Sequence, residues 1–269
     1  MMRPVVRRML TDALGRLLRR PLWRARLERL AGFPCAEPSY RFDVPDLESV
    51  YRVVQGNDGT LDVGRETGGD DLRALGRLAQ AVARPGMIVV EVGSWKGGST
   101  AVLAHVARAH GGRVFAVDHW RGNLGVPHHA QARELDVLSI FRRNMRALGL
   151  DDVVHPLVMP SAVAAGLFPD GTADLVFIDG DHRYHAVRDD LKHWRPKLRR
   201  GGLLCGHDSE THYGSLSPED QRRIDEHGEE DTLGPLHPGV LRALYDAFAD
   251  AQRIVSGTTI WYLPTDVVP

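Results

Sequence analysis

Two clusters of polar side chains have residue types that can bind a cation or move a proton. Asp179, Asp181 and His182 form the first cluster, and His207 and Asp208 form the second. Each cluster directly follows a short apolar run that predicts a buried strand. If the two strands are parallel neighbours, all five side chains meet at one rim of the sheet. Several carboxylates in one place need a cation or protons to relieve their repulsion, and a divalent metal there would also lower the pKa of a coordinated hydroxyl.

A glycine-rich turn follows another expected strand and has features of a nucleotide site. Gly93 and Gly97 allow a tight turn and a close approach of the backbone to a ligand, and Ser99 and Thr100 can cap the helix that follows. A dinucleotide site of the G-x-G-x-x-G type would place its second glycine where this chain has Trp95. The bulky side chain argues against a pyrophosphate on this turn, whereas a cofactor without phosphate does not need that contact.

Two acidic residues frame this turn. Glu91 lies near the end of the strand before it, and Asp118 ends the next expected strand. A carboxylate at the second position can accept hydrogen bonds from both ribose hydroxyls of a nucleoside, a feature shared with nicotinamide-dependent enzymes. The alternatives are a helix cap or loop carboxylate at Asp118, and a carboxylate paired with a nearby cation at Glu91. Lys96, within the turn, is expected to be solvated.

The elements that must carry these residues alternate between strands and helices. Short β-branched runs bounded by turn residues predict strands over 87–92, 113–118, 153–159, 173–179 and 203–205, with a closing pair at 252–255 and 258–263. Longer stretches predict helices over 71–82, 99–110, 134–148, 184–194 and 239–250. Such alternation predicts a parallel sheet with helices on both faces, and ligands bind such sheets at the carboxyl ends of the strands.

Composition sets the broad class of protein. The 269 residues are 43% hydrophobic, enough for a substantial buried core, and the formal net charge at pH 7 is -1. There is therefore no overall basic field to recruit nucleic acid. No apolar run has the length needed to span a bilayer. The two cysteines, Cys35 and Cys205, do not make a disulfide framework and predict a reducing, cytoplasmic setting.

Residues 1–30 differ from the rest in being rich in arginine, with leucines and valines between the arginines at roughly helical spacing. We expect an N-terminal helical extension and connector over 1–68 and the main domain over 69–269. The basic helices are expected to pack on the domain or on a partner subunit of a homo-oligomer. A basic arm in contact with a membrane surface and an organelle transit peptide are the alternatives. The polar stretch 209–238 predicts a lid-like insertion, or else a solvated surface loop.

The combined pattern resembles the class I S-adenosylmethionine-dependent methyltransferases over roughly residues 70–263. The segments that carry the resemblance are 90–99, 114–118, 174–182, 198–203 and 258–263. The resemblance implies an α/β, Rossmann-like methyltransferase fold with a seven-stranded, mostly parallel sheet. It also implies that the glycine-rich turn surrounds the methionine part of S-adenosylmethionine, that Asp118 holds the ribose and that Ser161 lies near the adenine. The residues that we accordingly assign to the cofactor are Glu91, Gly93, Ser94, Gly97, Ser99, Asp118, His119, Ser161 and Asp179.

Within that family, the two polar clusters resemble the metal site of the catechol-type and sugar-type O-methyltransferases. The resemblance implies Asp179, His207 and Asp208 as ligands of a divalent cation, Mg or Mn, and Asp181 or His182 as the general base. His207 departs from the family pattern because a carboxylate is usual there, and histidine favours softer ions than magnesium. Metal-free transfer with a histidine or aspartate base, and an arrangement without catalysis, are the alternatives.

Methyl transfer to a hydroxyl of a small molecule, such as a sugar or a phenol, is the function that the residues favour. A nicotinamide-dependent dehydrogenase is a second hypothesis, against which Trp95 counts. A third is a catalytically silent binding module, against which the set of acidic residues counts. A related branch of the family contains hydroxylases, so redox chemistry stays open as well.

Overall fold

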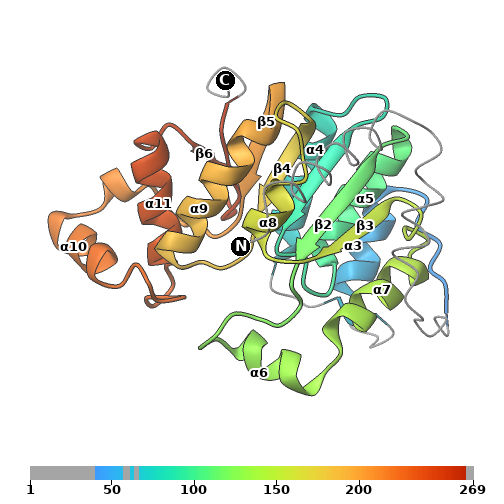
Figure 1. Ribbon diagram of the computed structural model, residues 1–269, viewed down its shortest axis with the longest axis horizontal. Coiled ribbons are helices and arrows are strands. Elements are labelled where there is room, and N and C mark those ends of the chain that lie inside the picture. The colour runs from blue at the N-terminus through green and yellow to red at the C-terminus, as the bar shows by residue number, and fades with distance from the viewer. Residues whose placement is uncertain (1–39, 57–60, 64–66, 265–269) are drawn as a thin grey trace, which may run out of the picture.

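The computed structural model describes residues 40–56, 61–63 and 67–264. The basic helices expected near the N-terminus lie outside these residues. The described chain forms one twisted sheet with helices on both faces (Figure 1). The predicted fold class, α/β with a seven-stranded and mostly parallel sheet, is confirmed. Among the described helices, none combines the length and the hydropathy needed to cross a bilayer.

The strands are arranged in the order β3-β2-β1-β4-β5-β7-β6. The first five strands of this order are parallel to their neighbours, whereas β7 is antiparallel to both β5 and β6. Their bounds are β1 Ile88–Val92, β2 Arg113–Asp118, β3 Val154–Val158, β4 Ala173–Ile178, β5 Leu198–Gly206, β6 Arg253–Ile254 and β7 Trp261–Tyr262. The strand order reverses between β1 and β4, so the switch point at which such sheets bind ligands lies between these two strands.

The strands form close to the expected runs because their apolar residues are buried by helices on both sides. All six residues of β4 are buried, as are four of the five in β1, which is typical of parallel strands covered on both faces. β5 is longer than the sequence predicts because it begins at Leu198, before the Gly201–Gly202 pair, and a register shift opposite Ala173–Leu175 accommodates the irregularity.

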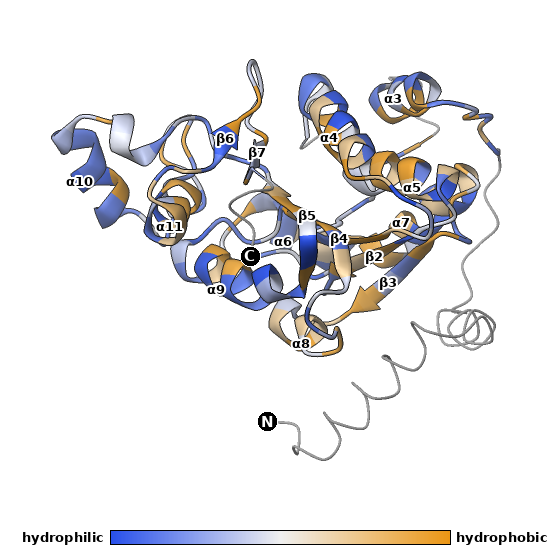
Figure 2. Ribbon diagram, turned by 90° about the horizontal axis from the view of Figure 1, so that it is seen from above, coloured by the Kyte–Doolittle hydropathy of each residue, from blue (hydrophilic) through white to orange (hydrophobic). Residues whose placement is uncertain are grey.

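Helices cover both faces of the sheet (Figure 2). One face carries α3 (Leu47–Gln55), α4 (Gly69–Ala81), α5 (Gly98–Ala109) and α7 (Val137–Ala147). The other face carries α8 (Ser161–Ala165), α9 (Tyr184–Trp194) and α11 (Pro238–Phe248). The sheet therefore lies between two hydrophobic cores and leaves its strand ends free for a site.

α3 and α6 are among the described helices that the sequence analysis does not predict. α3 falls within the predicted connector, where Asp46 caps the helix by accepting a hydrogen bond from the amide of Ser49 at 2.8 Å, and Val50 packs into the core. α6 (Pro127–Glu134) has no buried residue, so it lacks the apolar periodicity from which a helix is predicted. In Figure 1 α6 extends away from the sheet at the bottom of the view.

The stretch 209–238 forms an insertion between β5 and α11, with a short η3 (Tyr213–Ser215) and α10 (Pro218–Glu226). Figure 1 shows α10 at the far left of the molecule. The amide of Tyr184 donates to the carbonyl of Gly228 at 2.7 Å. A Cβ on Gly239 would lie 2.3 Å from the carbonyl oxygen of His182, so only glycine fits there. These contacts hold the insertion and the start of α11 against the loop that follows β4.

Candidate active site

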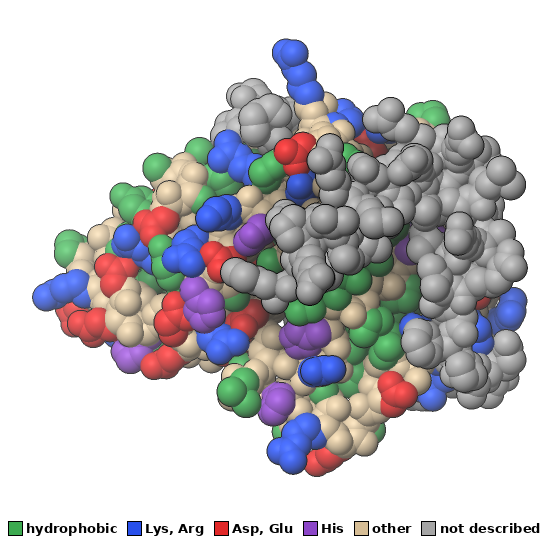
Figure 3. Space-filling model, in the orientation of Figure 1, with side chains coloured by type: hydrophobic (Ala, Val, Ile, Leu, Met, Phe, Trp, Pro, Cys, Tyr) green, Lys and Arg blue, Asp and Glu red, His purple; other side chains and the backbone are tan. Residues whose placement is uncertain are grey.

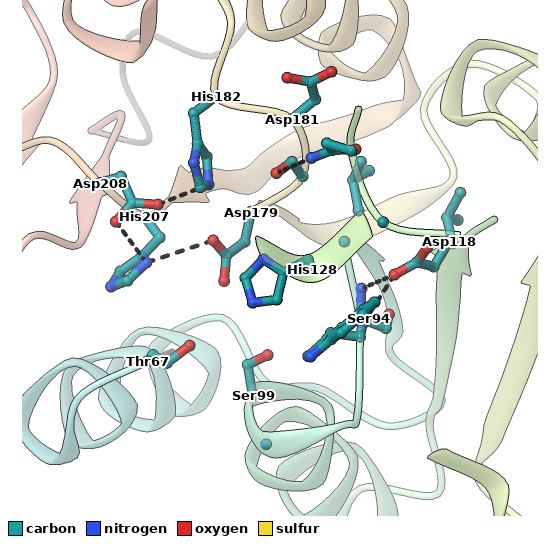
Figure 4. Close-up of a pocket in the computed structure, with 18 of the residues that line it drawn as sticks. Thr67, Ser94, Ser99, Asp118, His128, Asp179, Asp181, His182, His207 and Asp208 are labelled. Atoms are coloured by element: carbon teal, nitrogen blue, oxygen red, sulfur yellow. Dashed lines mark hydrogen bonds and ion pairs between the residues drawn. The ribbon is translucent and has the colours of Figure 1, made fainter. Parts of the chain in front are cut away.

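A cavity of about 790 Å³ lies at the carboxyl ends of the central strands, beside the switch point (Figure 4). Its lining brings together the glycine-rich turn after β1 and the two polar clusters after β4 and β5. The predicted site residues that line it are Gly93, Ser94, Ser99, Asp118, His119, Ser161, Asp179, Asp181, His182, His207 and Asp208. Glu91 and Gly97, which the sequence analysis also assigns to the cofactor, are not part of this lining.

The glycine-rich turn has a backbone that only glycine can adopt at two points. Gly93 has φ 87, and a Cβ there would lie 1.9 Å from the main-chain oxygen of Asp179. Gly97 has φ 94, and a Cβ there would lie 2.6 Å from the side chain of Met145. Trp95 between them has φ 44, a rare conformation for a bulky side chain. The turn is therefore fitted tightly between the loop after β4 and α7.

Glu91 lies behind the turn rather than in the cavity. Its side chain is fully buried and accepts hydrogen bonds from the hydroxyls of Ser94, at 2.7 Å, and of Thr100. Burial raises the pKa of Glu91 to about 7, although these hydrogen bonds oppose the rise. Glu91 thus fixes the turn from behind and differs from the cation-paired carboxylate named as its alternative. Lys96 is also buried, against the expectation of a solvated side chain, because its ammonium binds the Asp62 carboxylate at 3.0 Å.

Asp118 holds the turn from the other side. Its Oδ2 accepts hydrogen bonds from the amides of Ser94, at 3.1 Å, and Trp95, at 2.9 Å, and its Oδ1 accepts one from the amide of Trp120 at 2.6 Å. Each carboxylate oxygen accepts about two hydrogen bonds, so Oδ1 keeps room for one further donor. The carboxylate faces the cavity (Figure 4).

The remaining predicted cofactor residues lie at different depths. Ser161 accepts a hydrogen bond from the indole of Trp194 at 2.7 Å and contacts the buried Asp190, whose pKa burial raises to about 7. His119 is more exposed, and its Nδ1 accepts the amide of Arg121 at 3.1 Å. The cavity wall near Ser161 therefore contains a buried carboxylate on α9 that the sequence analysis does not assign.

Four polar residues meet at the rim after β4 and β5, and we call Asp179, His182, His207 and Asp208 the rim cluster. Nδ1 of His207 lies 3.4 Å from Oδ1 of Asp179 and 3.0 Å from Oδ1 of Asp208. Nε2 of His182 lies 3.0 Å from Oδ2 of Asp208 (Figure 4). Asp208 has φ 63, the left-handed region, which a non-glycine residue seldom occupies. The predicted convergence of the two clusters is thus present for these four residues.

Protonation in the rim cluster follows from the pairing of imidazoles with carboxylates. Burial lowers the pKa of His182, but hydrogen bonds to Asp208 and Asp231 outweigh it and raise that pKa to about 10. Burial likewise opposes protonation of His207, but the charge of Asp179 and the contacts with the neighbouring carboxylates raise its pKa well above the ordinary value. The same hydrogen bonds overcome the burial of Asp208 and hold its pKa far below the ordinary value. The carboxylates around the two imidazoles therefore favour the protonated form of both rings.

Asp181 does not join the rim cluster, although the sequence analysis expects it there. The guanidinium of Arg183 binds its carboxylate, with Nε 2.9 Å from Oδ1. Burial raises the pKa of Asp181, but the hydrogen bonds from Arg183 outweigh this and leave it below the ordinary value. In Figure 4 the carboxylate of Asp181 points away from Asp179 and His207. Asp181 therefore lines the cavity as half of an ion pair, which makes it a poor candidate for the general base.

Residues 90–209 match a family model described as a methyltransferase domain. The match spans the glycine-rich turn, Asp118 and the whole rim cluster. The matched segment is just under half of the chain, and over it the chain is similar to methyltransferase domains. A search of curated proteins finds a relative in Streptomyces olivaceus, the 8-demethyl-8-(2,3-dimethoxy-alpha-L-rhamnosyl)-tetracenomycin-C 4'-O-methyltransferase, which is 32% identical over 157 residues. The aligned region covers 50% of this chain and 57% of that relative, so the chain spans little more than half of the relative's length.

Solved structures share the fold of this chain. An S-adenosylhomocysteine-bound methyltransferase from Podospora anserina has a TM-score of 0.54 at 11% identity, with 88% of this chain and 91% of that chain covered. A putative caffeoyl-CoA O-methyltransferase from Staphylococcus aureus has a TM-score of 0.51 at 11% identity, with 81% and 91% covered. At these identities the likeness extends to the fold alone.

The structure adds to the rim four carboxylate and imidazole groups that the sequence analysis does not assign. Asp71, in the first turn of α4, has Oδ2 3.7 Å from Nε2 of His207. The insertion and the start of α11 supply the other three, which are Glu210, Asp231 and His237. His237 lies at the end of the insertion, and nothing in its local sequence pattern shows that it reaches the rim.

Backbone groups at the start of α4 also line the cavity. Thr67, Gly68 and Gly69 form part of the wall, next to Ser99 (Figure 4). The N-cap of α4 is Gly68, which has no side chain to accept hydrogen bonds from the first amides of the helix. On the face seen in Figure 3, acidic and basic side chains are interspersed over the left-hand part of the molecule, without a field of one sign there.

Proposed function

We propose that this protein is an S-adenosylmethionine-dependent O-methyltransferase that acts on a hydroxyl of a small molecule, such as a sugar or a phenol. One observation carries the proposal: a single cavity contains both the glycine-rich turn with Asp118 and the rim cluster. Nucleoside recognition and proton chemistry are therefore arranged in one space. The relative in Streptomyces olivaceus, whose name describes a 4'-O-methyltransferase of a rhamnosyl compound, supports a sugar hydroxyl as the acceptor.

The cofactor half of the cavity is assigned to the turn, Asp118 and the wall near Ser161. S-adenosylmethionine, when bound, supplies an electrophilic methyl group on its sulfonium. Asp118 binds the ribose through the free capacity of Oδ1, while its other hydrogen bonds keep the turn in place. Glu91 acts as a positioning residue, because it lies behind the turn and anchors Ser94. The bulk of Trp95 within the turn fits a cofactor without a pyrophosphate at that place.

The residues of the rim fit a divalent cation. Asp179, His207 and Asp208 each offer one ligand atom, and these atoms all lie within 4.8 Å of one another; we call these three residues the first seat. The nitrogen of His207 that faces both carboxylates is Nδ1, 3.4 Å from Asp179 and 3.0 Å from Asp208. We propose Mn or Mg for this seat, and the imidazole favours Mn of the two. A cation there would stabilise negative charge on an acceptor oxygen.

His182 is the residue that we assign to acid–base work at the acceptor hydroxyl, in preference to Asp181. It lies at the rim with Nε2 directed at Asp208, and Asp231 holds its Nδ1 at 2.9 Å. A carboxylate on the far nitrogen fixes the ring and its tautomer. Asp181 is instead committed to Arg183. When no cation is bound to its Nε2, His182 therefore holds or moves the proton of the acceptor, and the insertion that supplies Asp231 is proposed as the acceptor-side lid.

The test of the proposal is a transfer assay with S-adenosylmethionine labelled on the methyl group. The acceptor panel pairs molecules with vicinal hydroxyls, such as a deoxysugar glycoside and a catechol, with matched single-hydroxyl analogues. We expect label in an O-methylated product, and we expect none with Asp179→Asn under the same conditions. Equal label transfer by Asp179→Asn would show that the rim cluster takes no part in the reaction.

A further inference from the structure

A second group of cation-binding atoms lies at the rim beside the first seat. His182, Asp208 and His237 each offer one ligand atom, and these atoms all lie within 4.8 Å of one another. Nε2 of His182 is 3.0 Å from Oδ2 of Asp208, and Nδ1 of His237 is 3.7 Å from Oδ1 of the same carboxylate. The two imidazole rings meet edge to face with centroids 4.7 Å apart. Two nitrogen donors and one oxygen donor therefore converge at one point.

We propose that His182, His237 and Asp208 form a second cation seat, which takes a divalent transition metal. The seat shares Asp208 with the first seat, and the two oxygens of that carboxylate face different histidines: Oδ1 is 3.0 Å from Nδ1 of His207, and Oδ2 is 3.0 Å from Nε2 of His182. A carboxylate arranged in this way can bridge two cations.

Each of the two imidazole rings also contacts a carboxylate outside the second seat, as is usual for metal-binding histidines. Nδ1 of His182 lies 2.9 Å from Oδ1 of Asp231. Nδ1 of His237 lies 2.7 Å from Oε1 of Glu210, and the amide of His237 also donates to that side chain. Histidines that bind metals usually give their other ring nitrogen to a carboxylate, which fixes the ring and strengthens the donor. Asp231 thus holds the ring of His182 with Nε2 toward Asp208, and Glu210 holds the ring of His237 at the rim.

The charge around Asp208 also calls for a cation. The connected groups are the imidazoles of His182, His207 and His237 and the carboxylates of Asp71, Asp179, Asp208, Glu210 and Asp231. The carboxylates outnumber the imidazoles, so the group keeps a negative charge even when every ring is protonated. A divalent ion would relieve that repulsion. All three residues of the second seat line the cavity, which gives an ion a path from solvent.

The donor set selects the kind of metal. Magnesium prefers an oxygen shell and keeps several waters, whereas imidazole nitrogen suits Zn, Co, Ni and Fe. The second seat should therefore bind cobalt or zinc and reject magnesium. Because His237 begins α11, next to the insertion that supplies Asp231, the seat is complete only when the insertion lies against the rim.

The experiment measures the number of cobalt equivalents bound per protein chain. The full-length protein is first stripped of metal with a chelator and then dialysed against cobalt at micromolar concentration. We expect His237→Gln to bind one equivalent of cobalt fewer than the unmodified protein. The matched control is His227→Gln, because His227 is on the same insertion but pairs only with Glu230 among the described carboxylates. The control should keep the full number of equivalents. Circular dichroism and a thermal melt check that each variant is folded, and His182→Gln provides a second removal of the seat.

Magnesium at millimolar concentration should not compete for the equivalent that His237→Gln loses. Equal cobalt content in the unmodified protein and in both folded variants, His237→Gln and His182→Gln, would overturn the proposal. The readout is independent of methyl transfer, so a protein that fails to transfer methyl groups can still show the second seat. Asp179→Asn separates the two seats, since it should lose metal from the first and leave the cobalt of the second.

Discussion

A Cβ atom on Gly93 would lie 1.9 Å from the main-chain oxygen of Asp179. The turn after β1 and the loop after β4 are therefore in backbone contact, and the amide of Asp179 also donates to the carbonyl of Val92 at 2.8 Å. One end of this contact belongs to the proposed cofactor turn and the other to the first seat. The distance between the two halves of the cavity thus depends on the absence of a side chain at position 93.

Gly93→Ala should disrupt both halves at once. We expect binding of S-adenosylhomocysteine to weaken by at least about tenfold, or roughly 1.4 kcal/mol, because the loop after β4 must move away. Gly86→Ala is the matched control, since Gly86 also has a positive φ of 72 but has open space around its Cβ position. The unfolding free energy of Gly86→Ala should fall only by the backbone strain, about 1–2 kcal/mol. Calorimetry and denaturant unfolding measure the two effects, and equal affinities for the two variants would contradict the close contact.

Asp118→Asn should weaken cofactor binding and loosen the turn. The amide keeps a single oxygen acceptor, whereas the carboxylate serves the three amides of Ser94, Trp95 and Trp120 and, by our proposal, a ribose hydroxyl. We expect a loss of about 1.5–3 kcal/mol in binding free energy for S-adenosylhomocysteine, the range for a hydrogen bond to a charged group. Asp136→Asn is the control, because Asp136 also accepts an amide but caps α7. An unchanged dissociation constant in folded Asp118→Asn would show that another residue holds the ribose.

The sequence predicts the sheet and most of the rim well, for a physical reason. The runs around Val90 and Val176 are short, apolar and bounded by turns, so they have few alternatives to a buried strand. The polar residues directly after them, such as Asp179 and Asp208, then follow the strand ends to one edge. Their meeting requires only that β4 and β5 be parallel neighbours, which the alternation of strands and helices implies.

Other site residues depend on contacts between distant segments, which local patterns do not encode. Asp71 begins a helix and His237 ends an insertion, and each reaches the rim only through packing. The position of Asp181 is decided by Arg183, two residues away, which competes for its carboxylate. Glu91 is the reverse case, because its place in a strand is predictable but the direction of its side chain, behind the turn, is set by Ser94 and Thr100.

The burial of Glu91 should make the unfolding free energy of the protein depend on pH. Its pKa is about 7 in the folded chain and 4.5 as the ordinary value, so between these values the folded state holds more protons than the unfolded state. Stability from this group is therefore full below about pH 4.5 and is lost as pH rises through 7. Relative to Glu91→Gln, the unmodified protein should lose about 2–4 kcal/mol of unfolding free energy between pH 4.5 and 8.

This comparison is made by denaturant unfolding in cofactor-free protein with a chelator present. Glu134→Gln, at the exposed end of α6, is the control and should follow the unmodified protein at every pH. Parallel pH curves for the unmodified protein and Glu91→Gln would mean that Glu91 is ionised in the folded state across the range.

Removal of divalent metal should abolish methyl transfer and leave cofactor binding nearly intact. The first seat supplies three ligands, so two adjacent oxygens of an acceptor can fill open positions on the cation and be fixed for attack. We expect chelation to lower the rate on vicinal-diol acceptors by at least about a hundredfold, with recovery on adding manganese. Full activity after exhaustive chelation would show that methyl transfer proceeds by proton removal without a metal.

The central claim is that the cavity holds S-adenosylmethionine on the turn after β1. The most direct measurement is a calorimetric titration of the unmodified protein with S-adenosylhomocysteine and, separately, with NAD. The account predicts saturable binding of one equivalent of S-adenosylhomocysteine, weakened in Asp118→Asn and retained in Asp179→Asn, and binding of NAD that is weaker by at least about tenfold. No heat with S-adenosylhomocysteine, or NAD as the tighter ligand, would contradict it.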